Sequence, residues 1–153
     1  MKITTTEPNF YSGYQLFKGY TQPSLKTKHI KDFDKHFWYP TNTQKNMSVL
    51  EIGCGTGLFL QYLKFKGVAH YTGIDNDPAL ENFIHPDVKA QFKITDVFDF
   101  LRYQSSKQLF DRIVMFDVLE HFDQLTGKKL LLELAQFLEK NGEEFIPIAE
   151  GER

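Results

Sequence analysis

The sequence has little of several features that would by themselves decide a protein's class. Among its 153 residues there is one cysteine, Cys54, so no disulfide can form within the chain and a reducing compartment is expected. No apolar run approaches the roughly 18 residues that a membrane span requires, and the polar start, Met1 to Asn9, lacks the apolar stretch of a signal peptide. We therefore expect a cytoplasmic protein without a membrane segment.

A strong charge of either sign is also missing. The 18 lysine and arginine residues nearly balance the 20 aspartate and glutamate residues, for a formal net charge of -2. Such a chain has no strong field with which to attract nucleic acid or an anionic membrane, so neither is expected as a partner. The hydrophobic content of 41% is ordinary for one soluble globular domain.

Short apolar runs alternate with helical patterns along most of the chain. The strand-like runs are residues 47–52, 70–74, 91–94 and 110–116, and glycine or aspartate closely follows each. Helical spacing occurs in residues 24–38, 58–65, 98–103 and 127–140, with an ambiguous stretch at 78–83. This order predicts an α/β fold with a mainly parallel sheet, whose ligands bind beyond the carboxyl ends of the strands.

The most informative segment is a buried strand that turns into a helix through Gly53, Gly55 and Gly57. Alternate glycines permit positive φ angles and a close approach of the backbone to a ligand, although a tight turn without a ligand is the simpler alternative. The G-x-G-x-x-G pattern of dinucleotide-binding loops fails because Leu58 stands at the third glycine, and no Gly-Lys pair follows as in phosphate-binding loops. Both phosphate-binding interpretations are thereby weakened.

Acidic residues accompany the ends of the predicted strands. Glu51 precedes the glycine loop, Asp75 follows the second strand 22 residues after Gly53 (75 minus 53), and Asp96 closes the third. An acid in the position of Asp75 can accept hydrogen bonds from both hydroxyls of a ribose. Carboxylates along one crevice suit a cationic, hydroxyl-rich ligand better than a pyrophosphate.

The loop of Glu51, Gly53, Gly55 and Gly57 resembles the E/D-x-G-x-G-x-G loop of the class I S-adenosylmethionine (SAM)-dependent methyltransferases. The run from residue 110 to 122 is similar to that family's F-D-x-V-x-x-x-x-V-L-E-H segment, and four motifs occur in the family's order over residues 47–142. The resemblance implies a Rossmann-like, doubly wound, mainly parallel sheet in the strand order 3-2-1-4-5.

The same resemblance implies which residues hold SAM. The glycine loop would pass under the methionine part of the cofactor, Asp75 would bind the ribose hydroxyls, and Asp96 with the backbone amide of Val97 would contact the adenine. The expected cofactor-binding set is Glu51, Gly53, Cys54, Gly55, Gly57, Asp75, Asn76, Asp96, Val97, Phe116 and Asp117. Cys54 is interpreted as a small space-filling residue and not as a nucleophile.

His121 is the candidate catalytic residue, because a hydroxyl acceptor needs a base near the transition state and histidine is the usual one. The alternative is that His121 caps or packs a short helix. Asp117, Glu120 and His121 also stand at i, i+3 and i+4. A similar pattern occurs in ubiquinone-biosynthesis O-methyltransferases, where the resemblance would imply a divalent ion. We expect no metal ligand here, and the metal-bound alternative stays open.

The N-terminal region carries Tyr11 and Tyr14 in an aromatic, glycine-containing segment. It resembles the family's lid over the cofactor and acceptor, and simple packing of the aromatic rings against the sheet is the alternative. We expect residues 1–44 to form this lid with a helical segment, and residues 45–153 to form the SAM-binding domain.

The C-terminal region is short compared with the family core. After the turn at residues 140–142, only residues 145–148 are apolar enough for a fifth strand, and Pro147 cannot donate to a central ladder. We expect the family's strands six and seven to be absent, and a second subunit, as in a homodimer, to cover the open sheet edge.

The expected function is SAM-dependent transfer of a methyl group to a small-molecule or glycan-like acceptor, at oxygen. A catalytically silent SAM-binding module, or a truncated fragment that acts through a partner chain, is the alternative from another class. An NAD(P)-dependent oxidoreductase is disfavoured by Leu58. Methylation of nucleic acid is disfavoured because no Asn/Asp-Pro-Pro-aromatic motif follows the fourth predicted strand.

Overall fold

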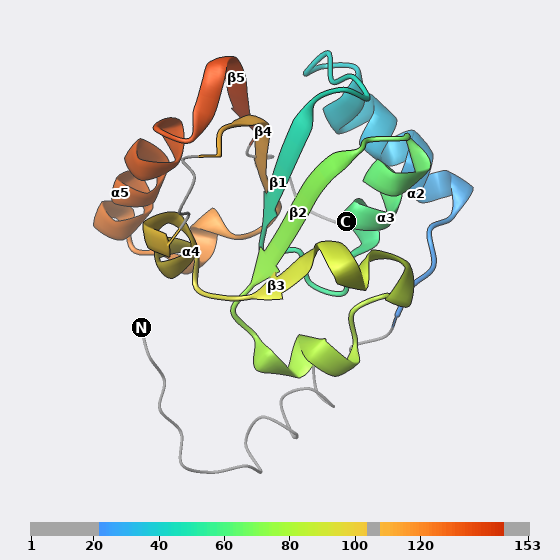
Figure 1. The fold of residues 1–153 in the computed structure, drawn as a ribbon, viewed down its shortest axis with the longest axis horizontal. Coiled ribbons are helices and arrows are strands. Elements are labelled where there is room, and N and C mark those ends of the chain that lie inside the picture. The colour runs from blue at the N-terminus through green and yellow to red at the C-terminus, as the bar shows by residue number, and fades with distance from the viewer. Residues whose placement is uncertain (1–21, 104–107, 146–153) are drawn as a thin grey trace.

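A computed structural model describes residues 22–103 and 108–145 of the chain. Its centre is a five-stranded parallel sheet in the order β3-β2-β1-β4-β5 (Figure 1). The strands are β1 (Ser48–Ile52), β2 (His70–Asp75), β3 (Phe92–Ile94), β4 (Phe110–Met115) and β5 (Leu138–Phe145). The predicted fold class and strand order are confirmed.

Helices cover both faces of the sheet (Figure 1). On one face, α2 (Thr27–Phe33) continues into a π-helix, η1 (Asp34–Trp38), and both pack with α3 (Leu58–Phe65). On the other face lie α4 (Val97–Tyr103) and α5 (Gln124–Ala135). Three short 3₁₀ helices complete the described elements: η2 (Pro78–Asn82), η3 (Pro86–Gln91) and η4 (Leu119–His121).

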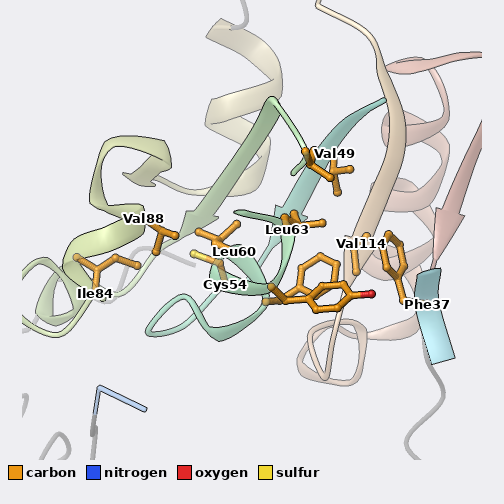
Figure 2. Packing of buried hydrophobic residues seen from close by; sticks show 11 residues of the cluster. Phe37, Val49, Cys54, Leu60, Leu63, Ile84, Val88 and Val114 are labelled. Carbon is orange, nitrogen blue, oxygen red and sulfur yellow. The ribbon is translucent and has the colours of Figure 1, made fainter. Parts of the chain in front are cut away.

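Strand β1 lies between β2 and β4, and its side chains alternate between two hydrophobic clusters. Val49 packs in the cluster on the α3 side, whereas Leu50 and Ile52 pack in the cluster on the α4 and α5 side. Figure 2 shows members of the α3-side cluster, which come from η1, β1, α3, η3 and β4. Because side chains of a strand alternate in direction, Glu51 shares the face of Val49 and points toward the α3 side.

An ion pair and aromatic rings hold the N-terminal helical segment against α3. The ammonium of Lys66, just after α3, lies 2.9 Å from Asp34 Oδ1 and 4.6 Å from the centroid of the Trp38 ring. The hydroxyl of Tyr62 donates a hydrogen bond of 2.6 Å to the same oxygen of Asp34. Burial raises the pKa of Asp34, but the hydrogen bonds from Tyr62 and Lys66 outweigh it, so the pKa is lowered overall. Asp34 is therefore a stable anion at neutral pH.

Helix α5 begins and ends earlier than its periodicity predicted. The pattern predicted a helix over residues 127–140, but α5 spans Gln124–Ala135. It starts earlier because the carboxylate of Asp123 accepts hydrogen bonds from the backbone N–H (2.8 Å) and hydroxyl (2.8 Å) of Thr126. It ends at Ala135 and not at residue 140.

Strand β5 takes the residues that follow. The fifth strand was expected at residues 145–148, but the observed strand begins at Leu138, and residues 146–148 lie outside the described residues. Leu138 of β5 pairs with Phe110 of β4, and Glu143 of β5 pairs with Arg112 of β4. The stretch of β5 between these two pairs is therefore longer than the matching stretch of β4. The extra residues form a bulge around Gly142. Residues 138–140 therefore belong to a strand that pairs with β4, although their local spacing favours a helix.

None of the helices within residues 22–103 and 108–145 combines the length and the apolar character that crossing a bilayer would take.

The space around Gly73 on β2 gives a test of the packing. A Cβ at this position would lie 2.5 Å from Leu60 Cδ1 and 3.0 Å from Cys54 Sγ. We expect Gly73→Ala to lower the free energy of unfolding by about 1–3 kcal/mol through overpacking, measured by chemical denaturation.

Gly127→Ala on α5 is the matched control. Its Cβ would meet the nearest atom, Leu119 Cδ1, at an ordinary 3.5 Å. Because alanine favours a helix over glycine by up to about 1 kcal/mol, the control is expected to be neutral or stabilising. Equal losses of stability in both variants would contradict the packing described for Gly73.

Candidate functional site

The glycine loop leaves β1 and crosses the carboxyl end of β2. The backbone N–H groups of Gly53 and Cys54 both donate to the carbonyl of Ile74, at 2.8 and 3.0 Å. Gly53, Gly55 and Gly57 have φ angles of 74°, 53° and 91°, in the left-handed region that favours glycine. The chain can therefore turn from β1 into α3 while it stays attached to β2.

The surroundings of Gly55 differ from those of the other two loop glycines. A Cβ at Gly53 would clash with Val118, and a Cβ at Gly57 would lie 2.8 Å from Val88 and 2.9 Å from Ile84. A Cβ at Gly55 would meet no atom of the described residues within 4 Å, apart from its own chain neighbours. The backbone of Gly55 thus faces open space, where a ligand can approach it closely.

The carboxylate of Asp75 connects the glycine loop to the end of β2. Its Oδ2 accepts a hydrogen bond of 3.0 Å from the Gly55 N–H, and its Oδ1 accepts one of 3.1 Å from the Asp77 N–H. Asp75 therefore orders the loop in addition to the ligand-binding role that the sequence predicted. Its neighbour Asn76 is exposed.

Glu51 is buried beneath the glycine loop. Its side chain is 3% exposed, and its Oε2 has no hydrogen-bond partner among the described residues. Burial, and secondly the negative charge of Asp75, raise the pKa of Glu51 well above the ordinary value. Ionisable groups with perturbed pKa values are enriched at functional sites, so this buried carboxyl group is a candidate functional group.

Cys54 lies beside Glu51 in the loop and is buried. Burial, followed by the charges of Glu51 and Asp75, raises the pKa of its thiol far above the ordinary value. The thiol therefore stays protonated, which agrees with the interpretation of Cys54 as a space-filling residue and leaves no nucleophile here.

Asp96 stands between β3 and α4. Its Oδ1 accepts hydrogen bonds from the N–H groups of Phe98 (2.8 Å) and Asp99 (3.1 Å), so this oxygen caps the N-terminus of α4. Val97, the first residue of α4, is buried. The sequence missed this capping role, although an aspartate before a helical pattern is its usual signal.

The chain beyond β4 passes over the glycine loop. Phe116 packs against the rings of Phe33 and Phe59, with centroid separations of 5.7 and 5.0 Å. Asp117 is exposed and has a φ of 53°, which is uncommon outside glycine. Val118 follows and lies against Gly53. The contact of Val118 with the loop has no signal in the sequence.

His121 projects away from the body of the protein. Its side chain is 76% exposed and its Nε2 lies 3.9 Å from Glu120 Oε1. Within residues 22–103 and 108–145, no three His, Cys, Asp or Glu side chains form a group that could hold a metal ion. The two lid candidates, Tyr11 and Tyr14, lie outside the described residues.

The parts of the site described so far come from four strand ends. β1 contributes Glu51, β2 contributes Asp75, the start of α4 after β3 contributes Asp96, and the segment after β4 contributes Asp117. The carboxyl ends of parallel strands meet at one edge of a sheet, which is where ligands of such folds bind. These four acids and the backbone of Gly55 therefore stand at one edge of the sheet, and we refer to this edge below as the acidic crevice.

A family model described as a methyltransferase domain matches residues 27–146. No curated protein sequence matches the chain.

Several solved structures share the fold. The plantazolicin methyltransferase BpumL in complex with SAH has a TM-score of 0.63 and 23% identity, over 92% of this chain and 53% of that one. Coclaurine N-methyltransferase bound to N-methylheliamine and SAH has a TM-score of 0.62 and 20% identity, over 78% of this chain and 35% of that one. The N-methyltransferase NodS from Bradyrhizobium japonicum WM9, in complex with S-adenosyl-l-homocysteine (SAH), has a TM-score of 0.61 and 21% identity, over 79% of this chain and 62% of that one. The chain thus spans 35% to 62% of the length of these three structures.

The buried Glu51 makes the stability of the protein depend on pH. As pH rises from the ordinary glutamate pKa toward the raised one, the unfolded chain releases this proton while the folded chain keeps it. The free energy of unfolding therefore falls with pH through this range, by at most about 1.4 kcal/mol per pH unit for one proton. We expect Glu51→Gln to remove this slope and to become more stable than the wild type as pH rises.

Denaturation midpoints and slopes measured from pH 4 to 9 check this expectation. Asp99→Asn on the exposed face of α4 is the matched control, since the contact of the Asp99 carboxylate with Arg102 is long, 3.9 Å, and the substitution keeps the backbone N–H that donates to Asp96. A stability difference between wild type and Glu51→Gln that stays constant with pH would contradict a raised pKa for Glu51.

Proposed function

The chain belongs to the methyltransferase domain family, and from this premise we propose that it binds SAM in the acidic crevice and transfers the methyl group of SAM to an acceptor. The observation that carries the proposal is the open space over Gly55, which is bordered by the carboxylate of Asp75. A close approach of backbone to ligand is the physical reason for a glycine at that position.

The residues of the crevice fit the chemistry of this cofactor. SAM has a cationic sulfonium, a cationic amino group and a ribose with two hydroxyls. Asp75 supplies negative charge, both carboxyl groups supply acceptor oxygens, and Glu51 Oε2 is a buried oxygen that has no hydrogen-bond partner among the described residues. We propose that Asp75 accepts hydrogen bonds from the ribose while it holds the Gly55 N–H, and that Oδ2 of Asp96 accepts from the adenine amino group.

The bound cofactor would supply a methyl group that is already strongly electrophilic. The protein's own residues therefore have to bind, orient and shield two reactants and need not provide a nucleophile. The glycine loop holds the cofactor from below, and the segment from Phe116 to Val118 borders it on the β4 side. The raised pKa of the Cys54 thiol is consistent with a role in packing alone.

For the acceptor, we propose a small molecule or glycan-like compound that is methylated at oxygen, with His121 as the base. The exposure of His121, 76%, supports access to a proton acceptor in solvent. Nitrogen is the competing acceptor atom, because two of the similar structures are named as N-methyltransferases. The alternative of a catalytically silent SAM-binding module, acting through a partner chain, predicts cofactor binding without turnover.

We also propose the division into a lid segment (residues 1–44) and a cofactor-binding domain (residues 45–153), a cytoplasmic location, and a second copy that covers the outer edge of β5. Among the described residues, β5 pairs only with β4, which leaves its other edge for such a contact.

Substitution of Asp75 tests the cofactor site. We expect Asp75→Ala to weaken SAM binding by about 1–3 kcal/mol, because it removes the ribose acceptor and the acceptor for the Gly55 N–H. Isothermal titration calorimetry with SAM measures this loss. Asp99→Asn, which changes an acid outside the crevice, is expected to leave the affinity unchanged, and an unaltered affinity of Asp75→Ala would rule out the proposed ribose contact.

Production of SAH tests turnover and the base. With panels of hydroxyl-bearing and amine-bearing small molecules, we expect SAH to form with hydroxyl acceptors. His121→Gln is expected to lower the rate roughly 10²–10⁴-fold, the usual contribution of a general base, with little change in SAM affinity. A rate that is independent of His121 would exclude it as the base, and SAM binding without SAH from any acceptor would favour the silent module.

A further inference from the structure

Glu51 is buried in a way that the packing of the fold does not explain. Its side chain is 3% exposed, and Oε2 lacks a hydrogen-bond partner within the described part of the chain. No basic side chain of the described residues lies within ion-pairing distance of it. A buried carboxylate without a partner is strongly unfavourable, so burial, and secondly the negative charge of Asp75, raise the pKa of Glu51 and favour its neutral acid form.

The charged groups on the elements around Glu51 are unable to neutralise it. From β2, Asp75 adds a second negative charge, and within the loop the Cys54 thiol remains protonated. From β4, Arg112 shares the face of Glu51, but its guanidinium donates to the carbonyls of Asp111 (2.7 Å) and Thr41 (2.6 Å).

Two further elements face the same side. From α3 and the residue after it, the polar groups of Tyr62 and Lys66 are engaged with Asp34. In the segment after β4, the first acidic residue along the chain is Asp117, which is exposed. A positive charge placed over Gly55 would therefore be the counter-ion that this cluster of acids lacks.

We propose that Glu51 is a proton-linked counter-ion of the cofactor, which is protonated in the free protein and releases its proton to solvent when SAM binds. The inference rests on the proposed function and adds a step to it. On binding, the O–H bond of the Glu51 carboxyl breaks, the electron pair stays on the carboxylate, and the proton passes to the buffer. The two positive charges of SAM stabilise the resulting anion across a poorly solvated interior, where charges interact more strongly than in water.

This linkage has a consequence for the reaction cycle. SAH lacks the sulfonium charge of SAM, so it stabilises ionised Glu51 less well. Loss of the sulfonium charge on methyl transfer then favours return of the proton to Glu51, which weakens the hold of the site on its product. Discrimination between SAM and SAH would thus increase with pH through the range in which Glu51 titrates.

Calorimetry in buffers that differ in enthalpy of ionisation counts released protons directly. We would titrate the full chain with SAM at about pH 6.5, where the α-amino group of the ligand remains charged. The expected result is a release of roughly 0.5–1 proton per SAM by the wild type, a smaller release with SAH, and none with SAM in Glu51→Gln. Asp99→Asn, the matched control, is expected to release as many protons as the wild type.

The outcomes separate the inference from the proposed function. If the wild type binds SAM with no release of protons, or if Glu51→Gln releases as many as the wild type, the inference is overturned while the cofactor assignment stands. If the wild type does not bind SAM in either buffer, the proposed function fails and the inference fails with it. Because the wild type alone reports proton release, the test does not depend on the folding of the variant.

Discussion

The close contact between the glycine loop and β2 is the constraint on which the site and the α3 side of the core depend. The N–H groups of Gly53 and Cys54 both donate to the carbonyl of Ile74 (2.8 and 3.0 Å), so the loop remains attached to β2 beyond the last residue of β1. Gly73 carries no side chain, which leaves room for Cys54 to lie against β2. The crevice is therefore built mainly by backbone contacts, and the side chains that line it are placed by them.

The same contact encloses Glu51, which is unfavourable for stability. A fold under selection for stability alone would place an apolar side chain at this buried position of β1, because the carboxyl group there loses its hydration while its Oε2 gains no hydrogen-bond partner from the described residues. Unfavourable local arrangements that the rest of the fold tolerates, such as this buried carboxyl group, are typical of binding sites. The burial of Glu51 is thus a physical sign of function that is independent of the sequence motif, and it agrees with the methyltransferase domain family to which the chain belongs.

Local patterns predicted the elements next to the site and failed farther along the chain. β1, β2 and β4 were predictable because each is an apolar run that ends at glycine or aspartate, and their order followed from the family resemblance. β5 was expected at residues 145–148 but spans Leu138–Phe145. Its start was misplaced because Leu138 lies within a helical pattern and pairs with Phe110, which is far away in the sequence. The π-helix η1 extends a correctly predicted helix, where Asp34 meets Lys66 and Tyr62.

The sequence by itself determined the residue types of the site, namely three glycines at alternate positions, an acid within β1, an acid at the end of β2 and an acid after β3. It did so because spacing and residue type limit the backbone conformations and the ligands that a loop can accept. Only the tertiary structure decided what each group does. Asp75 holds the Gly55 N–H, Asp96 caps α4 and Val118 lies over Gly53. Glu51 Oε2 lacks a hydrogen-bond partner within the part of the chain that the structure describes. These relations join segments distant along the chain, and the distances, burial and hydrogen bonds that define them exist only once the sheet has brought its strand ends together.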